Sequence, residues 1–169
     1  MGQGTRCDIY FSLCKEAVHE EVETVVEALP RGKETILMAE DEKEVGKLLR
    51  AFLEGLGYEV FLACDGEEAL SLFSARHRAI DLVILDAVMP KLSGPKVYDR
   101  MRAICPDLPC LFLTGYSEEI VQKYFGQGIE IPMLRKPVTF HEFGSKVREI
   151  LDQTSRSPHY PAETVQERF

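Results

Sequence analysis

The amino-acid sequence predicts an α/β fold in which helices cover both faces of a central parallel sheet. Short apolar runs alternate with amphipathic segments from Glu34 onward, the links between them are short, and five such pairs follow one another. Strands that are buried on both faces of a parallel sheet have near-continuous apolar sequences, as these runs have. With 169 residues, 45% of them hydrophobic, the chain has the size and composition of one soluble domain with terminal extensions.

The first two strand–helix pairs are predicted at 35–40 with 44–57 and at 58–63 with 65–77. TILMAE and YEVFLA are the apolar runs of these strands. The first helix carries apolar residues at helical spacing, namely Val45, Leu48, Leu49, Phe52, Leu53 and Leu56. Two glycines stand near its predicted end, where glycine commonly stops a helix.

The remaining three pairs are predicted from the same signals. They are 81–86 with 93–105, 108–115 with 117–128, and 131–137 with 139–152. Pro95 fits the first turn of its helix, where its missing N–H costs nothing. Thr139 and Glu142 have the spacing of a capping box, which predicts the start of the last helix.

Five parallel strands joined by right-handed crossovers leave few topologies, and the flavodoxin-like order is common at this size. We therefore expect a flavodoxin-like (βα)5 three-layer sandwich with strand order 2-1-3-4-5. The domain is expected over 34–152. An acidic linker is expected at 14–33, where glutamates are frequent, and a flexible tail at 153–169, which lacks apolar periodicity.

Composition and charge exclude several classes of protein. The formal net charge of -8 and the pI near 5.1 oppose a nucleic-acid-binding surface. The five cysteines include no C-x-x-C motif, which favours reduced thiols over a disulfide framework or a zinc site. No apolar run is long enough to span a bilayer. We expect a cytoplasmic segment that makes no membrane contact.

Polar residues stand where the predicted strands end. Glu40 and Asp41 follow the first strand, Asp86 ends the third, Thr114 ends the fourth, and Lys136 lies at the end of the fifth. The carboxyl ends of parallel strands share one edge of the sheet, so these side chains are expected to lie together.

This set of groups suits phosphoryl chemistry. Clustered carboxylates raise one another's pKa unless a cation neutralises them, and Mg²⁺ prefers such oxygen ligands. An ionised Asp86 can then act as a nucleophile towards phosphorus. Lys136 and the Thr114 hydroxyl can each contact a phosphoryl oxygen.

Each residue also has an ordinary structural explanation. Asp41 alone is typical of a helix N-cap, Thr114 of a strand residue, and Lys136 of a solvated surface charge. A functional site is favoured because all of these residues stand at the ends of predicted strands along the same edge of the sheet.

Four motifs carry a resemblance to a known family. ILMAEDE, VILDAVMPKLSG, FLTG and LRKP occur in order across 34–152, and together they resemble the receiver domain of response regulators in two-component signalling. The resemblance implies that Asp86 is the phosphoacceptor. It also implies that Glu40, Asp41, Asp86 and the backbone carbonyl of Val88 surround Mg²⁺.

The same resemblance assigns roles at the later strands. Thr114 would be the switch hydroxyl and Lys136 the phosphate-binding lysine, with a cis peptide bond between Lys136 and Pro137. Two features depart from the common receiver pattern. The acidic pair is Glu-Asp, and Met133 stands where many receivers carry an aromatic switch residue. Methionine is flexible and apolar and could fill the same space.

The first residues suggest a parent protein. GQGTRCDIYF, within 1–13, resembles the end of a histidine-kinase ATP-binding domain, and the acidic linker follows it. We expect the chain to be the C-terminal receiver of a hybrid sensor histidine kinase, whose membrane association is left open. The donor would be a histidine kinase or a histidine phosphotransfer domain.

The resemblance also implies the output. A downstream protein would bind the face formed by 117–128, 131–137 and 139–152, and homodimerisation through that face is an option. Self-catalysed phosphotransfer with slow autodephosphorylation is expected, and no enzymatic turnover.

Three alternative functions share features with this sequence. A phosphatase of the haloacid-dehalogenase type needs a second acid two residues after the nucleophile, where this chain has Val88. A phosphate-independent interaction module on the same fold is kept open by Met133. A nucleotide-binding flavodoxin relative is disfavoured, because no Gly-rich phosphate loop follows the first strand.

Overall fold

The protein forms a five-stranded parallel sheet with the order β2-β1-β3-β4-β5, which confirms the predicted fold class. The computed structural model describes residues 29–115 and 131–154. The strands are β1 (Thr35–Ala39), β2 (Glu59–Ala63), β3 (Leu82–Asp86), β4 (Cys110–Thr114) and β5 (Met133–Arg135). Each lies within a run that was predicted from sequence. The ends of β3, β4 and β5 are in register, since Asp86 pairs with Leu113 and Thr114 with Arg135.

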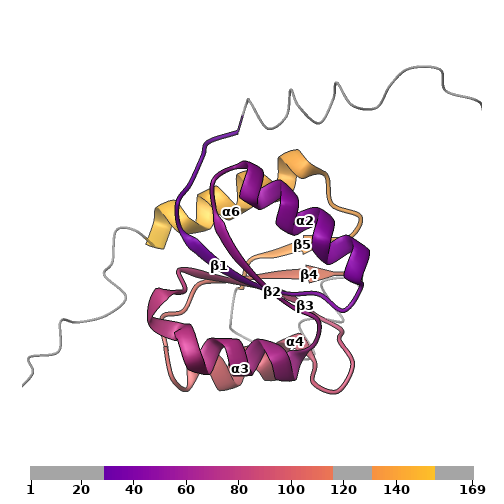
Figure 1. Ribbon diagram of the computed structural model, residues 1–169, viewed down its shortest axis with the longest axis vertical. Coiled ribbons are helices and arrows are strands. Elements are labelled where there is room, and N and C mark those ends of the chain that lie inside the picture. Colours follow the sequence, from indigo (N-terminus) through magenta and orange to yellow (C-terminus); the bar gives the residue numbers. More distant parts are fainter. Residues whose placement is uncertain (1–28, 116–130, 155–169) are drawn as a thin grey trace, which may run out of the picture.

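Helices cover both faces of this sheet. They are α2 (Lys43–Gly55), α3 (Gly66–Arg76), α4 (Gly94–Arg102) and α6 (Phe140–Thr154), with a 3₁₀ turn η1 (His77–Ala79) before β3. Figure 1 shows α2 and α6 on one face and α3 and α4 on the other. The fourth predicted helix, 117–128, lies outside the described residues, as do the predicted remnant at 1–13, most of the linker and nearly all of the tail. No described helix is long and apolar enough to cross a membrane.

Two hydrophobic cores result from the alternation of side chains along the strands. In β3, Leu82 and Ile84 belong to the core under α2 and α6, whereas Val83 and Leu85 belong to the core over α3 and α4. All four side chains are fully buried. This two-sided burial explains why the strands read as unbroken apolar runs rather than as alternating ones.

The observed elements are shorter than predicted where proline or a tight turn intervenes. Proline cannot donate to a sheet ladder, so β4 begins after Pro109 and β5 after Pro132. Thr139 caps α6 as expected. Its hydroxyl accepts from the Glu142 amide at 3.2 Å, and the Glu142 carboxylate accepts from the Thr139 amide at 3.2 Å.

The chain contacts the domain earlier than the predicted boundary at residue 34. Leu29 is buried and packs into a notch over Gly144 of α6, beside the ring of Phe52. The Gly32 amide donates to the Leu56 carbonyl at 3.0 Å. The last residues of the predicted linker are therefore packed against the domain, because burial of the apolar Leu29 side chain is energetically favourable.

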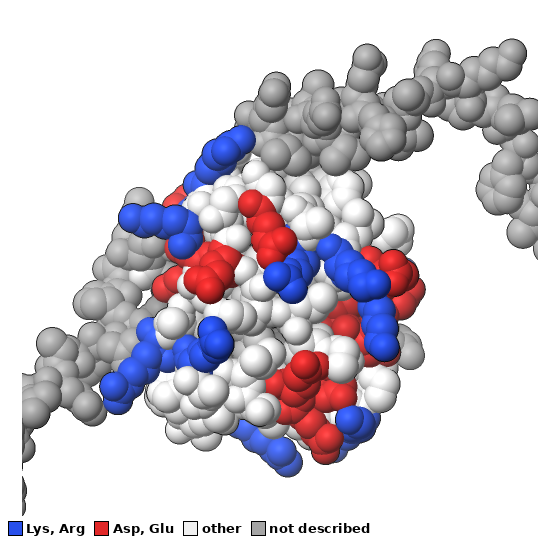
Figure 2. All heavy atoms as spheres, viewed as in Figure 1, with Lys and Arg blue, Asp and Glu red and all other residues white. Residues whose placement is uncertain are grey.

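Charged side chains of both signs are interspersed on the surface. Figure 2 shows Lys and Arg beside Asp and Glu over much of the visible face. Several form short ion pairs on one helix, such as Arg50 with Glu54 at 2.8 Å in α2. Interspersed charges of both signs favour solubility. They differ from the continuous basic surface that binds the phosphates of nucleic acids.

Gly94, the first residue of α4, fixes the distance between this helix and the end of β3. A Cβ atom at this position would collide with the backbone carbonyl oxygen of Asp86 and would come within 3.1 Å of the Phe112 ring. Backbone atoms cannot move away as a flexible side chain can. Only glycine allows α4 to start this close to the strand that carries Asp86.

We predict that Gly94→Ala lowers the free energy of unfolding by about 1–3 kcal/mol, because it forces α4 away from β3. Gly55→Ala is the matched control, since nothing lies within 4 Å of a Cβ atom there. The control should leave stability unchanged or raise it by up to about 1 kcal/mol through helix propensity. Thermal unfolding followed by circular dichroism compares the two, and equal stabilities would contradict the packing argument.

Candidate functional site

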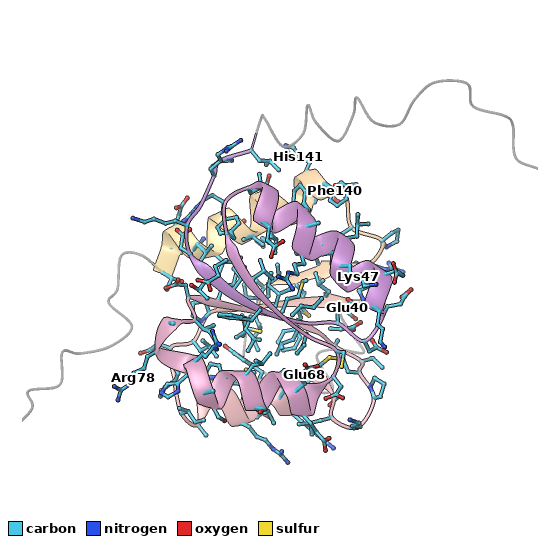
Figure 3. All side chains as sticks on the ribbon, viewed as in Figure 1. Glu40, Lys47, Glu68, Arg78, Phe140 and His141 are labelled. Atoms are coloured by element: carbon cyan, nitrogen blue, oxygen red, sulfur yellow. The ribbon has the colours of Figure 1, made fainter. Side chains whose placement is uncertain are left out.

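The carboxyl edge of the sheet gathers four of the polar residues singled out from the sequence. Glu40 directly follows β1, Asp86 ends β3, Thr114 ends β4, and Lys136 directly follows β5. Figure 3 shows Glu40 at the end of the sheet, beside α2. The Lys136 amide donates to the Thr114 carbonyl at 2.8 Å, which aligns the ends of β4 and β5.

The Lys136 ammonium joins the two buried carboxylates of this edge. Its Nζ lies 2.9 Å and 2.7 Å from the two oxygens of Glu40 and 2.7 Å from Oδ2 of Asp86. Glu40 is 1% exposed and Asp86 is 7% exposed, so neither charge is solvated by bulk water. Buried carboxylates need a paired cation, and Lys136 supplies one.

The environment shifts the pKa of two of these groups. Burial raises the pKa of the Glu40 carboxyl, and the nearby Asp86 charge adds to this effect while Lys136 opposes it. Burial alone would lower the pKa of Lys136, but its hydrogen bonds to Asp86 and Glu40 outweigh burial and raise it. Lys136 is therefore firmly charged at neutral pH.

A third carboxylate approaches the pair. One oxygen each of Glu40, Asp41 and Asp86 lie within 4.8 Å of one another, and Asp41 is exposed. Three carboxylates face one ammonium, so the cluster keeps an excess of negative charge. Carboxylate oxygens at this spacing fit a hard divalent cation such as Mg²⁺.

The second oxygen of Asp86 is held by the backbone of the following loop. The Val88 amide donates to Asp86 Oδ1 at 2.9 Å, and the Val88 side chain is 50% exposed beside the site. The residue two positions after Asp86 is thus a valine, whose side chain can neither donate nor accept a proton. This disfavours the phosphatase alternative, which requires a second acid there.

The structure places the remaining predicted residues as follows. Thr114 is 2% exposed at the end of β4. The peptide bond between Lys136 and Pro137 is cis. Met133 begins β5 opposite Phe112 and packs, partly buried, against the core over α3 and α4.

The loop after Asp86 makes a contact that the sequence does not predict. Lys91, in the loop after Asp86, forms an ion pair with Asp65 at the start of α3, with 2.7 Å between Nζ and Oδ2. These residues are 26 positions apart, and their opposite charges carry no periodic signal that would connect them. A glycine after Asp65 and a turn-rich loop around Lys91 are the only local cues.

Comparison with known proteins identifies the family. Residues 36–148 match the response regulator receiver domain. The chain is 30% identical over 122 residues to the sensor kinase CckA of Brucella abortus, covering 72% of this chain and 13% of that protein. It is 38% identical over 134 residues to the response regulator MprA of a Mycobacterium species, covering 76% and 56%.

A solved structure agrees with these sequence relatives. The receiver domain of the hybrid histidine kinase CckA aligns with a TM-score of 0.59 and 32% identity, covering 69% of this chain and 98% of that one. The chain spans from about an eighth to little more than half of the two curated relatives' lengths. The fold, the edge cluster and these similarities lead to one conclusion: the chain belongs to the response regulator receiver domain family of two-component signalling.

Proposed function

We propose that this chain is a phosphorylation-activated switch that accepts a phosphoryl group from phosphohistidine on Asp86. The observation that carries the proposal is the Asp86 carboxylate, buried yet at the open carboxyl edge of the sheet. It lies 2.7 Å from the Lys136 ammonium and next to two further carboxylates. This is the arrangement that an aspartyl phosphate requires, with a nucleophile, a cation and oxygen ligands in one place.

The transfer itself uses few protein groups. A carboxylate oxygen of Asp86 forms a bond to phosphorus as the phosphorus–nitrogen bond of the donor breaks. The bonding electron pair leaves with the imidazole nitrogen, which can then take up a proton. Lys136 neutralises a phosphoryl oxygen, and the Thr114 hydroxyl donates a hydrogen bond to another.

The metal ligands in this proposal are Glu40, Asp41, Asp86 and the backbone carbonyl of Val88. Bound Mg²⁺ would offset the charge of the carboxylates and of the incoming phosphoryl group. Asp41 is the exposed member of the set, whereas Glu40 is already engaged by Lys136. The exposed carboxylate is therefore the one most free to take up a metal.

The output in this proposal is a change of partner binding. A phosphoryl group on Asp86 adds negative charge beside Lys136 and Thr114, whose strands are joined by a backbone hydrogen bond. The surface that would respond includes β5, α6 and the helix that the sequence predicts at 117–128. It would bind a downstream protein or a second copy of the chain. Met133, in β5, replaces the usual aromatic residue of such switches and would couple by side-chain repacking.

The proposed setting is the C-terminal receiver of a hybrid sensor histidine kinase in the cytoplasm. The likeness of residues 1–13 to the end of a kinase domain supports it, as does similarity to CckA. The phosphoryl donor would be a histidine kinase or a phosphotransfer domain. Slow autodephosphorylation would end the signal, without catalytic turnover of other substrates.

Asp86→Asn should abolish phosphorylation, because the amide oxygen is a poor nucleophile for phosphorus. Incubation with acetyl phosphate and Mg²⁺, followed by intact-mass spectrometry, should show one added phosphoryl group on the unaltered chain and none on the variant. Omission of Mg²⁺ should suppress the gain. Asp99→Asn, which removes an exposed acid of α4, is the matched control and should be phosphorylated normally.

A folded chain that gains no phosphoryl group under any of these conditions would contradict the proposal. That result would favour the phosphate-independent interaction module, in which the edge cluster serves stability alone. A gain that persists in Asp86→Asn would instead place the phosphoacceptor elsewhere.

Mg²⁺ should stabilise the protein, since it binds carboxylates that are assembled only in the folded state. At ten times its dissociation constant, the gain should be about 1.4 kcal/mol, or a few degrees in Tm. Asp41→Asn should remove most of this gain, whereas Glu42→Gln, the same charge change at the next residue, should retain it. Equal Mg²⁺ responses in the two variants would show that Asp41 is not a ligand.

A further inference from the structure

The loop that follows Asp86 contains a backbone donor to the carboxylate of this residue. Residues 87–93 join β3 to α4, and the Val88 amide donates to Asp86 Oδ1 at 2.9 Å. Because this donor is a backbone group, the shape of the loop sets its position. The contacts that fix the conformation of the loop therefore also fix the orientation of the Asp86 carboxylate.

The loop contains a strained turn. The Leu92 amide donates to the Pro90 carbonyl at 2.7 Å, which closes a three-residue turn centred on Lys91. Lys91 has a φ of 65°, and within the described residues it is the one non-glycine residue with a positive φ. A γ-turn with a positive central φ is the rarer and more strained of the two forms. Such a conformation persists only when surrounding contacts hold it.

The Lys91 side chain makes the ion pair that stabilises this turn. Its Nζ lies 2.7 Å from Asp65 Oδ2 and 3.4 Å from a Glu67 oxygen. Asp65 Oδ1 accepts hydrogen bonds from the amides of Glu67 and Glu68, both at 2.9 Å, and so caps α3. The Asp65 side chain is only 15% exposed. Asp65 is therefore a fixed anchor rather than a mobile surface acid.

The hydrogen bond with Lys91 also lowers the pKa of Asp65, which keeps its carboxylate charged. The backbone supports the same docking at two points. Gly66 lies against the Leu92 carbonyl so closely that a Cβ atom there would come within 2.5 Å of it, and Gly94 touches the Asp86 carbonyl. The chain is thus packed against α3 at Leu92 and against β3 at Gly94, and the ion pair of Lys91 lies directly before these two contacts in the sequence.

We propose that Lys91 is a positioning residue for phosphoryl transfer at Asp86. Its ion pair with Asp65 holds the strained turn that directs the Val88 amide at the phosphoacceptor. The inference rests on the proposed function of Asp86, and it assigns to Lys91 no contact with the phosphoryl group. It explains why a lysine occupies a backbone conformation that glycine or asparagine would adopt more easily.

The test is the rate at which the full chain is phosphorylated by acetyl phosphate at saturating Mg²⁺. Lys91→Met and Asp65→Asn should each be roughly threefold to tenfold slower, since small misplacements at a reacting centre cost rate steeply. Asparagine caps helices as well as aspartate does, so Asp65→Asn removes the charge and keeps the cap. Lys91→Arg should restore most of the rate.

Two further readouts separate positioning from general stability. The double variant should be no slower than the slower single variant, because both remove one interaction. Raising NaCl to about 1 M should slow the unaltered chain more than Lys91→Met, because salt screens an exposed ion pair. Lys146→Met removes an exposed ion pair with Glu149 in α6 and should leave the rate unchanged.

Three results would overturn the inference. They are a wild-type rate in Lys91→Met, additive losses in the double variant, and an equal loss in Lys146→Met. If the unaltered chain is phosphorylated while Lys91→Met matches it, only this inference fails. If the unaltered chain gains no phosphoryl group, the proposed function fails and the inference falls with it.

Discussion

The placement of one ammonium between two buried carboxylates is the constraint on which the rest of the site depends. Glu40 and Asp86 are removed from water, and two such charges together are unfavourable unless a cation stands between them. Lys136 Nζ meets both, within 2.9 Å of the oxygens it contacts. The three residues come from segments up to 96 positions apart, so only the folded sheet can bring them together.

The sheet meets this constraint through its parallel topology. Strands β1, β3, β4 and β5 all end at the same edge, and each pairs in parallel register with its neighbour in the sheet. Glycine then sets how closely the helices approach. At Gly94, α4 begins in contact with the Asp86 carbonyl, so the end of β3 has no freedom to shift. Gly94 therefore links the packing of α4 to the position of Asp86 in the site.

Asp86 is held from three directions, and each contact has a different physical nature. Lys136 binds one oxygen electrostatically, the Val88 amide binds the other by a hydrogen bond, and Gly94 packs against the backbone carbonyl. Family membership accounts for the chemistry at this edge. This chain departs from the common family pattern at Met133 in β5 and at the Glu-Asp pair after β1.

Much of this arrangement was predictable because its causes are local in the sequence. Apolar runs such as LVILD predicted buried strands, and their alternation with helical segments predicted a parallel sheet. The strand order was expected because the flavodoxin-like order is common for such a sheet at this size. The spacing of Thr139 and Glu142 predicted the start of α6, which the hydrogen bonds between them confirm. The convergence of Glu40, Asp86, Thr114 and Lys136 followed from parallel topology alone, since strand ends share an edge.

Tertiary structure decided what depends on distance between remote segments. Nothing in the sequence connects Lys91 to Asp65, or Leu29 to the notch over Gly144, because such contacts arise from how closely helices and loops approach the sheet. The burial of Glu40 beside an exposed Asp41 likewise depends on tertiary packing, since the two neighbouring residues are both acids. The sequence by itself thus determined the fold and the membership of the site. Packing alone decided which carboxylate pairs with Lys136, how the loop after Asp86 is held, and where Leu29 is buried.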